Sequence, residues 1–112
     1  MLRGTVVEES LVDNRFLNEL DILSVRISSA EKPEDRWHLY QVRMTIEQIE
    51  HLAKQLKPEK WYAHFWDDEN IYVVFPGKTF LMSRDDKSTW TDAVSYGKSI
   101  DIPEEQLDFL ID

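Results

Sequence analysis

Three apolar runs separated by two short turns, all in the second half of the chain, constrain its fold more than any other feature. The runs cover residues 60–66, 71–75 and 79–83, and the turns fall at 67–70 and 76–77. Turns of two to four residues join antiparallel neighbours, because parallel strands need a crossover of a dozen or more residues. The segment therefore predicts a three-stranded antiparallel meander, which we expect to form the centre of the sheet.

Residues 22–29 and 37–44 show the alternation of apolar and polar side chains that indicates β-strands. The two segments together predict an antiparallel hairpin with a long connection, and residues 4–8 predict a short first strand. The first hairpin strand is expected to be half-buried through Leu23, Val25 and Ile27. The side chains expected to face inward from the second are Tyr40, Val42 and Met44.

A helix is predicted to begin after Thr45. The Thr45 hydroxyl can accept a hydrogen bond from a first-turn amide, and Gln48 three residues later completes a capping box. Pro58 helps to end the helix, because the residue before a proline is pushed out of α geometry. The apolar stripe at helical spacing consists of Ile46, Ile49, Leu52, Ala53 and Leu56.

A second helix is predicted from a cap at Ser88 or Thr89 to about residue 98, with Gly97 near its end as a helix stop. Residues 101–104 predict a further helix start, because a proline is tolerated in the first turn and acids favour the positive end of the helix dipole. The apolar side chains expected to pack this last segment are Leu107, Phe109 and Leu110.

These elements lie in a chain of 112 residues without a linker or a low-complexity segment, which predicts a single domain over residues 1–112. With 42% hydrophobic residues the chain has material for a core. The predicted fold class is α+β, with an antiparallel sheet of five or six strands and two or three helices mostly on one face.

Charge and cysteine content exclude several kinds of protein. The chain has 13 Lys+Arg against 22 Asp+Glu, a formal net charge of −9, which argues against a nucleic-acid-binding protein. The absence of cysteine excludes disulfides, a thiol nucleophile and cysteine-ligated metals. No apolar run of signal-peptide or membrane-spanning length occurs, so we expect a cytoplasmic protein without membrane contact.

The candidate binding face centres on His64, which lies mid-strand between aromatic neighbours. Strand alternation places Tyr62 and Trp66 on the same side as His64, and the next strand adds Val73 and Phe75. Apolar rings with polar tips suit a pocket for a small molecule. The commoner role of such a face is packing against helices. No serine or second carboxylate completes a catalytic set around His64.

Metal and phosphate sites are not predicted. The spacing of His38, His51 and His64 matches no zinc pattern, and the acidic turn at 67–70 lacks the glycine and the terminal glutamate of a calcium loop. Gly77-Lys-Thr imitates the end of a phosphate-binding loop, but Tyr72 stands where that loop needs its first glycine. We therefore expect no cofactor and no metal.

Several short motifs together resemble a family of small uncharacterised prokaryotic proteins. The motifs are WYAHFW at 61–66, VVF at 73–75, GKTF at 77–80, STW at 88–90 and IPEEQLDF at 102–109. The resemblance implies a cytoplasmic prokaryotic protein, and because the family has no assigned activity it transfers no functional residue.

The sequence favours a non-enzymatic module that recognises another protein or a second copy of itself. The missing catalytic set, the acidic segment at 101–112 and the aromatic content of the sheet favour this function. The alternative is a small-molecule-binding protein or small enzyme that uses the aromatic pocket around His64. A weaker alternative is an acidic mimic that blocks a nucleic-acid-binding protein.

Overall fold

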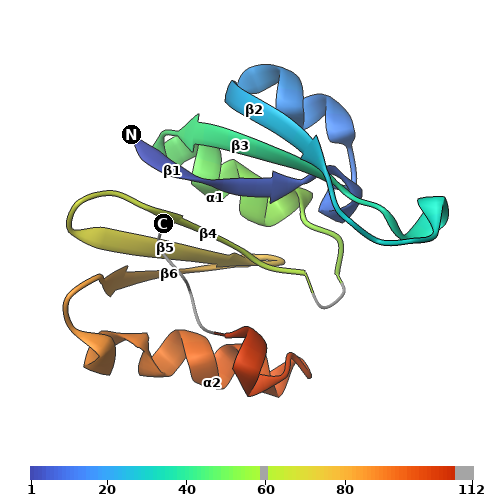
Figure 1. The fold of residues 1–112 in the computed structure, drawn as a ribbon. Helices are drawn as coiled ribbons and strands as arrows, with labels where there is room; N and C mark the ends of the chain where they lie inside the picture. The colour runs from blue at the N-terminus through green and yellow to red at the C-terminus, as the bar shows by residue number, and fades with distance from the viewer. Residues whose placement is uncertain (59–60, 108–112) are drawn as a thin grey trace.

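The computed structural model describes residues 1–58 and 61–107, and it contains a six-stranded antiparallel sheet (Figure 1). The strand order is β2-β3-β1-β4-β5-β6. The α+β class and the sheet of six strands predicted from the sequence are confirmed. The strands are β1 (Leu2–Val7), β2 (Asp21–Ile27), β3 (His38–Met44), β4 (Ala63–Trp66), β5 (Asn70–Phe75) and β6 (Lys78–Ser83).

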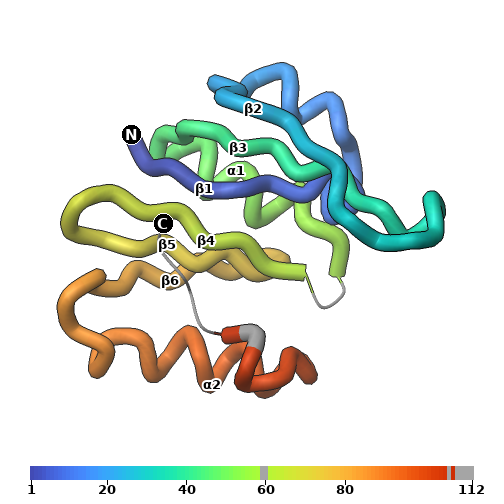
Figure 2. The backbone as a smooth tube through the Cα atoms, viewed as in Figure 1, coloured from blue at the N-terminus to red at the C-terminus, as the bar shows by residue number. Residues whose placement is uncertain are grey.

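The predicted meander is present as β4-β5-β6, but its predicted place at the centre of the sheet is wrong. It forms one end of the sheet, and β1 lies between β3 and β4 (Figure 2). β1 pairs with β3 along its whole length and with β4 through two residue pairs, Arg3 with Trp66 and Gly4 with Phe65. The sheet thus has two halves, β2-β3-β1 and β4-β5-β6. The meander lies at one end because β1, and not a strand of the meander, joins these halves.

Gly4 makes the contact between the halves close. A Cβ atom at Gly4 would overlap the carbonyl oxygen of His64 and the ring of Phe65. Any larger residue at this position would therefore push β1 away from β4 or displace the buried Phe65 ring.

The two α-helices within residues 1–58 and 61–107 lie on opposite faces of the sheet, rather than mostly on one. Helix α1 (Ile46–Gln55) packs in a cluster with β1 and β3 that also takes Phe65 and Val74. Helix α2 (Thr91–Ser99) packs on Ile71, Val73 and Phe75. Because neighbouring residues of a strand point to opposite faces, Val74 belongs to one cluster and its two neighbours to the other. Figure 1 shows α1 beside β1 and β3, and α2 beside β6.

Short 3₁₀ helices complete the secondary structure. They are η1 (Glu8–Ser10), η2 (Asn14–Glu19), η3 (Pro33–Asp35), η4 (Lys87–Trp90) and η5 (Glu104–Gln106). Over residues 1–58 and 61–107, none of the helices has the length and apolarity needed to cross a membrane.

The capping box predicted for α1 is confirmed. The Thr45 hydroxyl accepts from the amide of Gln48 at 3.2 Å, and the Gln48 side chain accepts from the amide of Thr45 at 2.9 Å. Four of the five predicted stripe residues are buried, but Ile46 is 48% exposed because it lies in the first turn, at the end of the helix.

The second helix differs from its prediction in its cap and in the role of Gly97. Asp86 caps η4 by accepting from the amide of Ser88 at 3.0 Å, and α2 follows directly. Gly97 lies within α2, where a Cβ atom would come within 2.6 Å of Leu107 Cδ2. Gly97 therefore allows Leu107 to pack on the helix, and the left-handed turn after α2 falls at Asp101, with φ of 67°. Phe109 and Leu110 lie outside the described residues.

The predicted burial of β2 is wrong. The hairpin of β2 with β3 is present, but every residue of β2 is exposed. A register shift between Ile22 and Ser24 also breaks the predicted alternation, because Val25 pairs with Tyr40 whereas Leu23 falls in the bulge. β2 is exposed because it forms the edge of the sheet and contributes no residue to either hydrophobic cluster.

Substitutions in α1 should separate capping from core packing. We expect Thr45→Ala to lower the free energy of unfolding by about 1 kcal/mol, since a first-turn amide loses its partner. Leu52→Ala should lower it by about 2–5 kcal/mol, because Leu52 is fully buried and its removal leaves a cavity. Urea denaturation measures both, with the exposed-site variant Ile46→Ala as control. A Leu52→Ala protein as stable as the wild type would remove α1 from the core.

Candidate functional site

The five residues of the predicted binding face lie on one face of the sheet, the face that α2 covers. His64 pairs with Val73, and its ring stacks on Trp66 with 5.5 Å between centroids. The Tyr62 ring lies 5.8 Å from the Phe75 ring. The structure therefore brings the predicted residues together as strand alternation suggested.

Burial divides this face into two parts. Val73 and Phe75 are fully buried, and Phe75 lies 5.1 Å from the Tyr96 ring of α2. These two side chains therefore belong to the core beneath α2. Tyr62, His64 and Trp66 are half-buried, and a binding role for these three stays a prediction.

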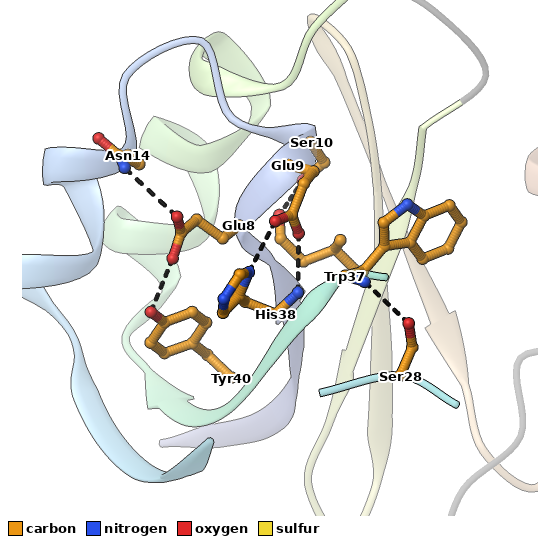
Figure 3. A network of polar contacts seen from close by, with 9 residues as sticks. Glu8, Glu9, Ser10, Asn14, Ser28, Trp37, His38 and Tyr40 are labelled. Atoms are coloured by element: carbon orange, nitrogen blue, oxygen red, sulfur yellow. Dashed lines mark hydrogen bonds and ion pairs between the residues drawn. The ribbon is translucent and has the colours of Figure 1, made fainter. Parts of the chain in front are cut away.

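A polar network that the sequence did not predict joins the end of β1 to β3 (Figure 3). Glu9 accepts from the backbone amide of His38 and contacts the Nδ1 atom of its ring, both at 2.8 Å. Glu8 accepts from the Tyr40 hydroxyl at 2.7 Å and from the Asn14 amide at 3.4 Å. His38 and Tyr40, two residues apart on β3, present their polar tips to successive acids of η1.

The contacts shift the pKa values of Glu9 and His38 toward an ion pair, and they shift the pKa of Tyr40 toward its neutral form. Desolvation raises the pKa of Glu9, but the hydrogen bonds from the His38 ring and amide outweigh it, so the pKa lies below its usual range. The hydrogen bond to Glu9 raises the pKa of His38, against a smaller effect of desolvation. The hydrogen bond to Glu8 raises the pKa of Tyr40, and desolvation adds to it. The pair Glu9–His38 is therefore charged around mildly acidic pH.

This network supports a structural role better than a catalytic one. A carboxylate that orients an imidazole is half of a general-base system. Among the described residues, however, no hydroxyl lies within hydrogen-bond distance of the other ring nitrogen of His38. Glu8, Glu9 and His38 also place one ligand atom each within 4.8 Å of one another, as a divalent cation would need. Both carboxylates already accept hydrogen bonds, so a cation would have to displace them.

The exposed edge of the sheet carries apolar side chains along β2. We call the strand's exposed side chains, from 21 to 27, the β2 edge. Its four large apolar residues are 40–50% exposed, and they are Ile22, Leu23, Val25 and Ile27. Nearby Trp37 is 44% exposed and meets the Trp61 ring edge-on at 5.0 Å. Within the described chain, β2 has a strand neighbour on one side only.

A basic hollow lies beside this edge, on the face of β2-β3-β1 opposite α1. Its volume is about 230 Å³, and side chains of three strands and of Trp66 on β4 line it. We call it the basic hollow. The side chains that line it are those of Arg3, Thr5, Leu23, Arg26, Gln41 and Trp66. Residues of β1 and β3 on this face alternate with those packed against α1, and on β2 Arg26 alternates with Val25 and Ile27.

The two arginines of the basic hollow have no acidic partner in the described part of the chain. Arg3 and Arg26 form no ion pair there, whereas Arg43 on the same face contacts Asp21 at 2.6 Å. Arg3 also lies directly opposite Arg43 across β1 and β3. Among the described residues, neither guanidinium group is neutralised, although the chain has 22 acidic and 13 basic residues.

Sequence reasoning missed both the network and the hollow. The network depends on contacts between residues 29 and 32 positions apart, and the hollow on the order of β2, β3 and β1. The signals that were available are the adjacent acids after the first strand and the spacing of His38 and Tyr40 on one strand face.

Comparisons of the chain with known protein families, with curated proteins and with solved structures find no match. The family resemblance drawn from the sequence motifs therefore stays a prediction. Any functional interpretation consequently depends on the side chains and the surfaces of this chain alone.

The Glu9–His38 pair should make part of the stability depend on pH. Because the pKa of His38 is raised on folding, its contribution is complete below the unfolded imidazole value and is lost as pH rises through the folded one. We expect Glu9→Gln to destabilise the protein more at about pH 5.5 than at about pH 9, and to lower the His38 pKa measured by NMR. Glu34→Gln, at an exposed residue of η3, is the control. An unchanged His38 pKa in Glu9→Gln would contradict the pairing.

Metal should not be needed for folding. A cation at Glu8, Glu9 and His38 would have to break hydrogen bonds that already satisfy these groups. We expect EDTA, zinc and manganese each to leave the melting temperature unchanged in differential scanning fluorimetry. A rise of several degrees with zinc that is absent in His38→Ala would instead establish a metal site there.

Proposed function

We propose that this protein is a non-enzymatic module that binds another protein through the β2 edge. The partner contributes an extended segment that pairs with β2 as a seventh strand of the sheet. The observation that carries the proposal is an edge strand of seven residues, all exposed, on which Ile22, Leu23, Val25 and Ile27 remain 40–50% exposed.

An edge strand of this kind favours strand addition, because its outward amides and carbonyls have no neighbouring strand. The opposite edge differs. At the end of β6, the Ser83 amide donates to the Thr89 hydroxyl at 2.9 Å, and the Trp90 ring nitrogen donates to the Ser83 carbonyl at 2.7 Å. Helix η4 and its neighbouring side chains thus occupy the backbone at one end of that edge, whereas β2 is exposed along its whole length.

Another protein is a better occupant than a second copy of the chain. Each copy carries a net charge of −9, so two copies repel at close range, where salt screens least. We further propose a cytoplasmic prokaryotic setting, which the motif resemblance supports.

A small molecule bound around His64 is the second candidate function. Its support is the half-buried position of Tyr62, His64 and Trp66, and the place of Trp66 in the lining of the basic hollow. The full burial of Val73 and Phe75 weakens this candidate, because two of its five residues are out of reach of a ligand.

A charge placed on the β2 edge should abolish partner binding. Val25→Lys keeps the fold, because lysine is tolerated on exposed edge strands, but it opposes an added strand. We expect proteins that copurify with the tagged wild type from its own host to fall at least about tenfold with Val25→Lys. Leu81→Lys, at a 58% exposed residue of β6, is the matched control and should retain them.

Two outcomes would contradict the proposal. One is an identical set of bound proteins for wild type and Val25→Lys. The other is a dimer in sedimentation equilibrium that Val25→Lys dissociates, which would make a second copy the occupant of β2.

A further inference from the structure

We propose that the partner strand alternates apolar and acidic side chains, with its acidic side chains directed to the basic hollow. This inference rests on the proposed function, since it assigns the chemistry of the segment that pairs with β2. Its support is the different character of the two faces of β2, and the fact that Arg3 and Arg26 have no acidic partner among the described residues.

The two faces of β2 present different chemistry to an added strand. Val25 and Ile27 pair with Tyr40 and His38 of β3, so they lie on the α1 side of the sheet. Arg26 lies between them in sequence, and so points to the opposite face, where it lines the basic hollow. Side chains of an added strand also alternate between these faces. One set would contact Val25 and Ile27, and the other would contact Arg26.

The positive charge of the basic hollow indicates that the side chains of the added strand that face it are negatively charged. Arg3 stands opposite Arg43 across the strands, and like charges in that position destabilise a sheet. Asp21 offsets the charge of Arg43 at 2.6 Å, but no described acid offsets Arg3 or Arg26. A carboxylate on a strand added beside β2 would pair with Arg26, and its charge would also offset that of Arg3 across the hollow. Glutamate and aspartate are therefore the side chains that complement this face.

The shape of the hollow fits carboxylate side chains rather than a nucleic acid strand. Thr5 and Gln41, which pair across β1 and β3, also line it, and their polar groups tolerate a charged neighbour; Trp66 lines it from β4. A volume of about 230 Å³ holds one or two side chains. Binding of a phosphate backbone instead depends on many basic contacts along a track, on a surface that is not net acidic. The protein has a net charge of −9.

Selection from a peptide library tests the inference. A heptapeptide library displayed on phage, with valine alternating with randomised positions, is selected against the full chain. We expect aspartate and glutamate to be enriched at the randomised positions. Selection against Arg26→Glu, or against Arg3→Glu, should shift the enrichment toward lysine and arginine. Lys54→Glu, which makes the same change of charge on the exposed side of α1, should leave the acidic preference unchanged.

The failures of the two proposals are distinguishable. If Val25→Lys selects the same peptides as the wild type, the peptides do not bind at β2 and the proposed function is wrong. If Val25→Lys selects none, but the wild type shows no acidic preference, strand addition stands and the acidic partner is overturned. An acidic preference that Arg3→Glu and Arg26→Glu both leave unchanged would also overturn the inference.

A double-mutant cycle with one enriched peptide gives the strength of the contact. By fluorescence anisotropy, Arg26→Gln should weaken binding about tenfold, and so should glutamate-to-glutamine in the peptide. Combining the two changes should cost no more than either alone. Fully additive losses would place the carboxylate away from Arg26. Tighter, Arg26-dependent binding of a labelled single-stranded oligothymidine would assign the hollow to nucleic acid and overturn the inference.

Discussion

The contact between β1 and β4 is the constraint on which the rest of the structure depends. Only two residue pairs join these strands, and Gly4 is small enough to let them meet over the buried ring of Phe65. On one side of this contact, β1 and β3 pack against α1, together with Phe65 and Val74 from the other side. On the other, β4-β5-β6 packs against α2 on the opposite face. Because α1 lies on one face and α2 packs on β5 on the other, the face of β2-β3-β1 away from α1 stays open, and the basic hollow lies there.

The sequence predicted features that depend on neighbours in the chain. The Thr45 cap, the β2-β3 hairpin and the meander are all set by local spacing, by turns or by capping chemistry. The strand order was not predictable in this way, because β1 is short and its pairing with β3 and β4 is decided by packing. The apolar residues of β2 suggested burial, but an exposed edge strand and a buried one can have the same alternation.

For the candidate site, too, the sequence predicts which side chains share a face of the sheet, but not how deeply they are buried. Alternation places His64 and Trp66 on one face, but it does not indicate which helix covers that face or how far. The burial of Phe75 follows from the choice of face by α2, which is a tertiary effect. The two arginines of the basic hollow come from β1 and β2, which are not adjacent in the sheet, so predicting that they line one hollow would have required the order of three strands.

The division of the core has a consequence for the order in which the chain can fold during synthesis. The cluster around α1 takes residues from β1 and β3, but it is completed by Phe65 and Val74 from the other half. A nascent chain that has emerged only through α1 therefore exposes an apolar surface that its own residues cannot yet cover. β1 is made before either of its neighbours, and it must wait for β4 before the seam at Gly4 can close. Of the six strands, β1 is therefore synthesised first, and its second neighbour, β4, is synthesised much later.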